Sequence, residues 1–476
     1  MVRKMGARSI VVEDVLERSD ILEELGHLEA SSDLTGGDVT ACAVTFLRCG
    51  VRRDRDANRI ESNAVIGQVT IITFPTAEGK RSYVFEAILR LPGSQYGTEP
   101  LLNNHVPISS ELALSFMGVT HTIPSSYFCQ QNGLTSICPH SAVRTLIRTM
   151  TSRSVSVPQL NESWRYDPRT RKVTTVQVGH ALREFGDLRA IPYDPGKSWK
   201  PNLSEGWELP ALLADSGSAS LLVLSDGHTD HVIPVLGHTI NSDEWHPIGT
   251  QLHKKGQTTV SSSSLWTDHL VMHDDMLGPY FCLSKAGLLP AKDAPLKPRL
   301  AIAILPEGVK VSPTQAEDFA RQILGLLIRE IAPTGFGQGR WWKHLSELRE
   351  RQVFRTTLIT RDEYIATLPD TTHTGQAKEV LAQKLPETMW MSEISVPNLF
   401  IGNRSKLGEV LVRADQFPPD TGADPLAVLN SLAGFRLPSI ISWPVGIDGD
   451  LSFEMMRWPE REHRPIYAPK HHRNWW

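Results

Sequence analysis

Residues 129–150 read CQQNGLTSICPHSAVRTLIRTM. From residue 139 onward, apolar residues recur at helical spacing with arginines and threonines between them, which predicts an amphipathic helix. Pro139 suits the first position of that helix because its φ is fixed and it has no N–H to leave unpaired. We therefore expect Cys138 at the helix cap.

A thiol at a helix N-terminus faces unpaired backbone N–H groups and the positive end of the helix dipole, and both favour the nucleophilic thiolate of Cys138. The amide side chains of Gln130, Gln131 and Asn132 lie just upstream, where one of them could donate a hydrogen bond to an oxyanion. The segment thus holds the ingredients of acyl transfer. The alternative is that Cys138 is a small buried hydrophobic residue, as free cysteines often are.

The composition is that of a soluble protein. The chain has 476 residues, enough for two to four domains, with 40% hydrophobic and 21% charged residues. A net charge of −4 gives no basic field for nucleic acid, and no apolar run reaches the length of a membrane span or a signal core. Five widely spaced cysteines form neither a disulfide framework nor a paired metal motif. We expect a cytoplasmic protein that binds neither nucleic acid nor membrane.

The first region, residues 1–110, is predicted to be β-rich with an N-terminal helix. A helical pattern lies within residues 9–31, and strand-like runs follow at 43–47, 64–74 and 82–89. The last two runs are joined by a turn sequence, which predicts a β-hairpin.

In the second region, residues 111–292, helix precedes strands. Strand-like runs at 219–224, 231–237 and 269–273 follow the helix after Cys138, an order typical of α+β folds. The third region, residues 293–476, mixes a strand at 299–305 with a capped helix from residue 313 and later strand-like and helical segments, and is predicted to be mixed α/β.

A cysteine nucleophile needs a base and a third group to orient that base. His231 heads one predicted strand, and Asp274 ends the next strand-like segment. If these strands are neighbours, the imidazole and the carboxylate come within reach of each other.

These residues resemble the papain-like cysteine peptidases, and most closely the bacterial branch that includes the bacteriocin-processing (double-glycine) peptidases. Cys138 resembles the nucleophile that opens a helix, residues 231–237 resemble the histidine strand ending in glycine, and Asp274 with Gly278 resembles the acid turn. The resemblance covers residues from about 120 to 285.

The resemblance implies a papain-like domain between the two flanking regions, and a Cys138–His231–Asp274 triad with Gln131 at the oxyanion. It also implies cleavage of a peptide or isopeptide bond in a protein or peptide substrate, without metal or cofactor. The flanking regions could recognise a protein partner.

Two spacings depart from the family pattern. Gln131 lies seven positions before Cys138, slightly further than usual, so Gln130 is an alternative. His231 and Asp274 are 43 positions apart, which requires an insertion, most simply residues 239–265. This leaves the neighbouring Asp275 and the earlier Asp268 as alternative orienting acids.

Three further functions stay open at this point. The same residue types serve transglutaminase-like acyl transfer, and a papain-like domain can persist as an inactive binding or scaffold protein. His228, Asp230 and His231 also resemble the second half of the H-x-H-x-D-H motif of metallo-β-lactamase-like zinc hydrolases. However, Asp226 stands where that motif begins with histidine, and a strand follows His231 where that fold requires glycines and a helix.

Overall fold

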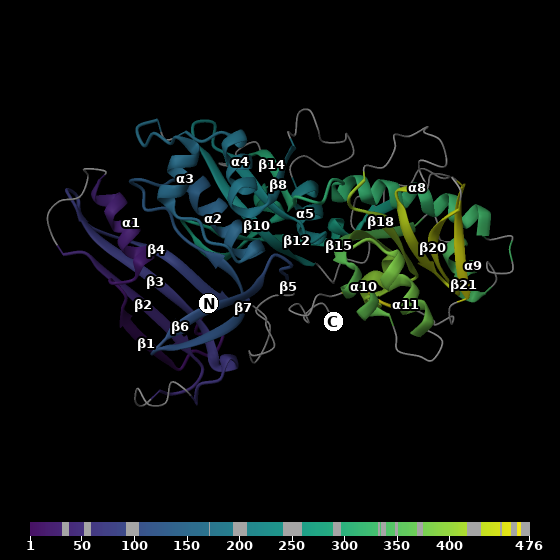
Figure 1. The fold of residues 1–476 in the computed structure, drawn as a ribbon, viewed down its shortest axis with the longest axis horizontal. Coiled ribbons are helices and arrows are strands. Elements are labelled where there is room, and N and C mark those ends of the chain that lie inside the picture. The colour runs from purple at the N-terminus through teal and green to yellow at the C-terminus, as the bar shows by residue number, and fades with distance from the viewer. Residues whose placement is uncertain are drawn as a thin grey trace.

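The computed structural model describes residues 1–30, 38–51, 59–91, 104–170, 172–193, 207–240, 259–288, 297–331, 334, 339–347, 351–368, 375–416, 430–447, 450–457 and 464–467. It is a mixed α+β fold. Three large sheets lie along the long axis of the molecule in chain order (Figure 1).

The N-terminal sheet has the strand order β1-β2-β3-β4-β7-β6, with every neighbouring pair antiparallel. Its elements are β1 (Ser9–Asp14), α1 (Ser19–Glu29), β2 (Thr40–Leu47), β3 (Val65–Thr76), β4 (Gly79–Arg90), β6 (Ser110–Phe116) and β7 (Val119–Phe128). The predicted hairpin is β3–β4. Helix α1 packs its Ile21, Leu25 and Leu28 on this sheet.

The segment that contains the predicted N-terminal helix begins with the edge strand β1, at residues 9–14. Ile10, Val11 and Val12 are β-branched residues that fit a pleated strand better than a helix, and they pair with β2 in register. Only the later part of the segment, α1, is helical.

The central sheet has the order β13-β12-β10-β9-β14-β8, with β5 paired to β10. Its elements are β5 (Asn104–His105), α2 (Cys138–Thr151), α3 (Val157–Trp164), α4 (Thr175–Gly186), β8 (Leu188–Tyr193), α5 (Glu208–Asp215), β9 (Ala219–Ser225), β10 (Asp230–Ile240), β12 (Thr267–Asp274), β13 (Gly278–Ser284), α7 (Lys285–Leu288) and β14 (Lys297–Pro306).

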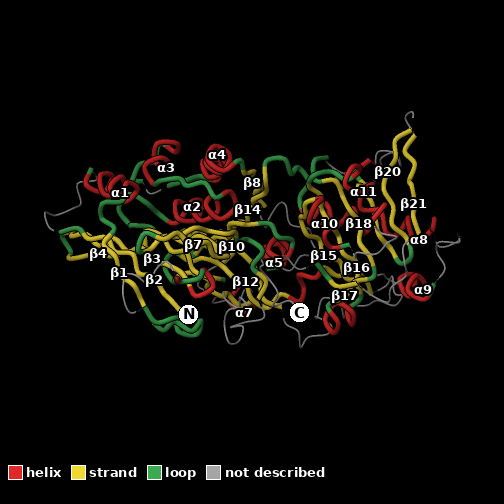
Figure 2. Tube along the Cα trace, turned by 60° about the horizontal axis from the view of Figure 1, so that its bottom comes forward, coloured by secondary structure: helices red, strands yellow, loops and turns green. Residues whose placement is uncertain are grey.

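Helices cover both faces of this sheet. Side chains alternate across β9, so that Leu221 joins the core under α2, α3 and α4, whereas Leu222 joins the core under α5. Figure 2 shows α1, α2, α3 and α4 along the same side of the strands. The result is a strand β9 without an exposed face, which explains its continuous apolar sequence.

The three strands predicted in the second region are β9, β10 and β12. Pro234 lies within β10 despite its missing N–H, because β10 pairs there with β9, and pairing with β12 begins only at Val235. Of the expected insertion 239–265, residues 239–240 end β10 and residues 241–258 lie outside the described residues. Residues 259–265 belong to β11 (Thr259–Ser262) and to a 3-10 helix (Ser263–Trp266).

The C-terminal sheet has the order β11-β15-β16-β18-β19-β20-β21 and is antiparallel except for the parallel pair β11–β15. Its further elements are α8 (Pro313–Ile331), α9 (Arg340–Glu347), β15 (Arg351–Thr360), α10 (Arg361–Thr367), α11 (Gly375–Lys384), β16 (Thr388–Ser395), β18 (Gly408–Arg413), β19 (Leu432–Leu437), β20 (Ile440–Ile447) and β21 (Asp450–Arg457), beside the small pair β17 (Ser405–Lys406) and β22 (Arg464–Pro465). This antiparallel pairing corrects the α/β expectation for the third region.

The predicted region boundaries at residues 110 and 292 do not coincide with the boundaries between the sheets. Strands β6 and β7 follow residue 110 but complete the N-terminal sheet, and β14 follows residue 292 but sits inside the central sheet. The sequence indicates where strands lie, whereas their partners depend on tertiary contacts. None of the described helices is long and apolar enough to cross a membrane.

Candidate active site

Cys138 is the first residue of α2. The extended backbone of Ile137 (φ −130°, ψ 173°) makes it the N-cap, and Pro139 takes the second helical position. The expected order is therefore shifted by one residue, with the thiol in the first turn rather than at the cap. The N–H of Cys138 has no partner among the described residues, as is usual for the first turn of a helix.

The loop before α2 is held by the side chain of Asn132. Its Oδ1 accepts hydrogen bonds from three successive backbone N–H groups, those of Leu134, Thr135 and Ser136, at 2.9, 2.9 and 3.1 Å. Because this loop leads directly into the helix, its compact turn fixes where Cys138 starts.

His140 anchors the first turn of α2 from the other side. Its Nδ1 accepts the N–H of Ile137 (3.2 Å), and its Nε2 lies 2.8 Å from Oδ1 of Asn161 on α3. Burial lowers the pKa of His140 to about 4, so the ring is neutral and Nε2 carries the proton that is donated to Asn161.

His231 and Asp274 lie on adjacent antiparallel strands, at the start of β10 and the end of β12, so the strand pairing brings them together. Nε2 of His231 lies 3.4 Å from Oδ2 of Asp274. The other oxygen, Oδ1, accepts the N–H groups of Met276 (2.8 Å) and Leu277 (3.0 Å). Burial alone raises the pKa of Asp274, but these hydrogen bonds outweigh it and the pKa is lowered, so Asp274 is a fixed carboxylate.

Cys138 lies close to His231. Sγ of Cys138 is 3.9 Å from the carbonyl oxygen of Asp230, the residue before His231. Burial lowers the pKa of His231, but hydrogen bonds with Asp274 and with Cys138 raise it more, and the net value is about 10. The effect of Cys138 on this pKa shows that the thiol and the imidazole interact through their side chains.

Asp275 is the second acid at His231. Its Oδ1 is 3.6 Å from Nε2 of His231, and both of its carboxylate oxygens are buried without a hydrogen-bond donor. Burial raises the pKa of Asp275 to about 6, and the neighbouring charge of Asp274 adds to the rise. Asp268 lies at the opposite end of β12 and pairs with His269 (3.1 Å), so it is not at the site.

The two glutamines have different surroundings. Oε1 of Gln130 accepts the N–H of Val84 (2.8 Å), and its Nε2 donates to the carbonyl of Asp275 (3.1 Å), so Gln130 ties β4 to the acid turn. Gln131 is half-buried, and its side chain makes no hydrogen bond with the described residues. Neither glutamine lines the small depression in which Cys138 lies. The role of Gln130 has no local sequence signal, because its partners lie 46 and 145 positions away.

His273 is a buried histidine beside the candidate site. It lines the same depression as Cys138. Its Nδ1 donates to the carbonyl of Tyr127 (3.1 Å), whereas Nε2 has no hydrogen-bond partner in the described part of the chain. Burial lowers the pKa of His273 to about 3, so the ring is neutral and is no cation for a thiolate.

The possible metal ligands differ from the zinc alternative predicted from sequence. Within the described ranges, the group able to hold a metal is His231, Asp274 and Asp275, whose ligand atoms lie within 4.8 Å of one another. His228 and Asp230 are not part of it. The carboxylate of Asp230 turns instead to the guanidinium of Arg299, because consecutive strand residues face opposite sides.

No protein-family model, no curated protein and no solved structure matches this chain.

Proposed function

We propose that the protein is a thiol-dependent hydrolase, a cysteine peptidase with a papain-like central domain. The observation that carries this proposal is the convergence of Cys138, His231 and Asp274 from one helix start and two adjacent strand ends. The helix bearing the thiol packs against the antiparallel strand bearing the histidine, and the acid follows on the next strand, which is the arrangement that the family resemblance implies.

The proton positions follow from the geometry. Asp274 and Asp275 both face Nε2 of His231, so Nδ1 is the nitrogen left for the sulfur and the substrate. With its raised pKa, His231 is cationic at neutral pH and stabilises the thiolate of Cys138.

In the proposed reaction, the Cys138 thiolate attacks the substrate carbonyl and the oxyanion accepts the open N–H of Cys138. The amide of Gln130 is already used, and Gln131 does not line the depression at Cys138, so we assign the oxyanion to the N–H of Cys138. The C–N bond then breaks as His231 gives its proton to the leaving amine. Water, deprotonated by His231, finally hydrolyses the thioester and regenerates the thiol.

The surface beside the triad suits a peptide substrate. Met276 and Leu277 follow Asp274 directly and expose 72% and 65% of their area. Their N–H groups are held by Asp274, so their side chains turn outward beside the site. Exposed apolar side chains at a catalytic centre favour substrates with an apolar residue near the scissile bond.

Alkylation by iodoacetamide at pH 6 tests the proposal, because ordinary thiols are almost unreactive there. We expect mass spectrometry to find the label at Cys138, and His231→Ala to slow labelling by at least tenfold. Cys129→Ala is the matched control: Cys129 is 1% exposed and burial raises its pKa, so the rate at Cys138 should stay unchanged.

Two results would contradict the proposal. One is a Cys138 that reacts no faster than a peptide thiol and is indifferent to His231→Ala, as in an inactive scaffold protein. The other is stoichiometric zinc in the purified protein that disappears with His231→Ala.

A further inference from the structure

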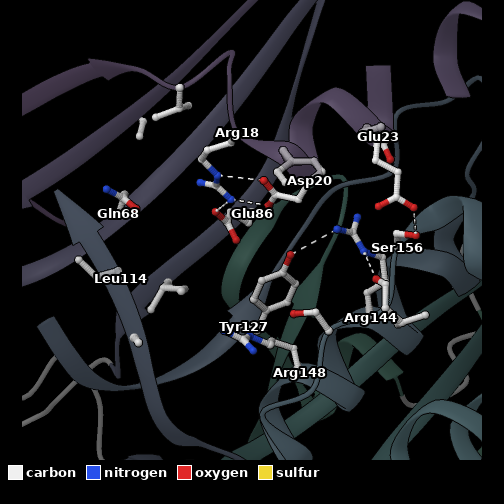
Figure 3. Close-up of a pocket in the computed structure, with 18 of the residues that line it drawn as sticks. Arg18, Asp20, Glu23, Gln68, Glu86, Leu114, Tyr127, Arg144, Arg148 and Ser156 are labelled. Atoms are coloured by element: carbon white, nitrogen blue, oxygen red, sulfur yellow. Dashed lines mark hydrogen bonds and ion pairs between the residues drawn. The ribbon is translucent and has the colours of Figure 1, made fainter. Parts of the chain in front are cut away.

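A second cavity, of about 460 Å³, lies between the N-terminal sheet, α1 and the helices α2 and α3 (Figure 3). Its lining shares no residue with the depression at Cys138. The volume is within the range of small-molecule sites. Part of the wall is apolar and aromatic, with Phe85, Ile88, Leu114 and the ring of Tyr127.

The most unusual side chain in this wall is Arg144. It is only 7% exposed, yet it makes no ion pair with any described carboxylate. Its Nε donates to the carbonyl of Val155 (3.2 Å), its Nη2 lies 3.5 Å from the hydroxyl of Tyr127, and its guanidinium stacks 5.3 Å from the ring centre of Phe85. Buried guanidinium groups are normally paired with an anion, because desolvating an uncompensated charge is costly.

Arg148 lies one helical turn after Arg144 and lines the same cavity. Its Nη1 donates to the carbonyl of Ser152 (2.5 Å), and it too has no carboxylate contact among the described residues. Two like charges four residues apart on a helix repel each other. An anion held between them would relieve this repulsion and compensate the charge of Arg144.

The acids of the opposite wall are already occupied. Arg18 binds both Asp20 (2.6 Å) and Glu86 (2.7 Å), and Glu23 accepts a hydrogen bond from Ser156 (2.8 Å) (Figure 3). The buried carboxylate of Glu24 accepts hydrogen bonds from Tyr83 and Asn132, both at 2.9 Å. Its charge also attracts Arg144, but the two side chains form no ion pair, so Glu24 compensates the guanidinium only in part. These negative charges oppose the entry of a polyanion, so the cavity suits a ligand with a single anionic group.

We propose that this cavity binds a small molecule with one carboxylate or phosphate group on an apolar or aromatic body. The anionic group lies between Arg144 and Arg148, whose planar guanidinium groups match the oxygens of either anion. The apolar body packs on Phe85 and Leu114. The site is independent of the proposed peptidase reaction, because none of its residues takes part in that reaction.

Calorimetric titration of the full-length protein tests this site directly. The probes are phenyl phosphate and phenylacetate, which share the ring and differ in the anion, and benzyl alcohol, which has no charge. We expect one of the two anions to bind at one site per chain, with benzyl alcohol at least tenfold weaker. Arg144→Gln should weaken anion binding at least tenfold and Arg148→Gln severalfold, whereas the exposed Arg183→Gln on α4, outside the cavity, should leave it unchanged.

The proposal is overturned if neither anion binds, if benzyl alcohol binds as tightly as the anions, or if both arginine variants bind like the wild type. If circular dichroism shows that Arg144→Gln does not fold, the test uses Arg148→Gln and Arg148→Glu instead. Unchanged affinity of both variants for the anions rejects the site. Binding that persists in Cys138→Ala, a variant without the thiol, keeps this result separate from any result on peptidase activity.

Discussion

At the residue scale, the charge state of His231 depends on the carboxylate beside it. We expect Asp274→Asn to lower the pKa of His231 from about 10 by one unit or more, because the variant removes the ionic partner at 3.4 Å. An NMR titration of the ring measures this pKa, and alkylation of Cys138 at pH 6 should slow about tenfold. An unchanged titration would show that Asp275, not Asp274, supports the imidazolium.

The same pKa fixes the sign of a stability effect. His231 titrates near 6.5 in an unfolded chain and near 10 in the fold, so its stabilising contribution is complete below about pH 6.5 and is lost as the pH rises toward 10. The melting temperature of Asp274→Asn should therefore decrease less than that of the wild type as the pH rises from about 6.5 to 10.

The charged form of Asp275 destabilises the fold, whereas the charged form of His231 stabilises it. Its pKa is raised to about 6, so the folded state prefers the protonated form and loses stability as the pH rises from about 4 to 6. Asp275→Asn should stabilise the protein by on the order of 1–3 kcal/mol at pH 7.5, with the gain vanishing near pH 4. Urea unfolding at both pH values measures this difference. A destabilised variant at pH 7.5 would mean that attraction to the His231 cation outweighs the burial of the charge.

At the element scale, β10 is the strand that positions the histidine, and Gly237 allows the paired strand β5 to lie close beside it. A Cβ on Gly237 would lie 2.2 Å from the carbonyl oxygen of His105 on β5, a backbone atom that cannot move aside alone. We expect Gly237→Ala to cost about 2–3 kcal/mol of unfolding free energy in urea titration. Gly325→Ala in α8, where the added Cβ meets nothing, should be neutral or stabilising by up to about 1 kcal/mol. Equal effects of the two substitutions would refute the close contact between β10 and β5 at Gly237.

The elements near the site were largely predictable, but their pairing was not. Apolar runs marked β9, β10 and β12, and the periodic segment after Pro139 marked α2. No local signal shows that β7 pairs with β4 across a long connection, or that β14 inserts beside β9. Strand pairing depends on contacts distant in sequence, which residue patterns do not encode.

In the candidate site, too, some features were predictable from the sequence and others were not. Cys138, His231 and Asp274 each sit at the end of a predictable element, so their residue types and positions were visible. The burial of Asp275 and the structural use of Gln130 were not, because both depend on side chains that approach from other elements.

At the scale of the whole molecule, a buried ionic network joins the central and C-terminal sheets. Arg355 on β15, 1% exposed, contacts Asp215 at the end of α5 (3.2 Å) and Glu393 on β16 (2.9 Å). Asp215 also contacts His238 on β10 (3.1 Å), the strand that begins with His231. The C-terminal sheet is thus coupled through charges to the strand that carries the proposed base.

Removal of Arg355 should therefore destabilise the fold strongly. Arg355→Met leaves Asp215 and Glu393 buried without this cation, and we expect a loss of about 3–5 kcal/mol at pH 7 in urea unfolding. The control is Arg329→Met, whose pair with Glu330 is about 70% exposed on both sides and should matter little. Similar losses in the two variants would show that burial does not strengthen the Arg355 contacts.

The pH dependence separates an electrostatic loss from a packing defect at Arg355. Burial raises the pKa of Asp215, but the hydrogen bond with His238 and the charge of Arg355 outweigh it and bring the value to about 2. In the wild type, this carboxylate stabilises the fold above about pH 4 and loses that effect only as the pH falls toward 2. Without Arg355 the pKa of Asp215 rises, so acid should neutralise the unpaired charge and shrink the deficit of Arg355→Met between pH 7 and pH 4. A deficit that is constant over this range would instead identify lost packing as its cause.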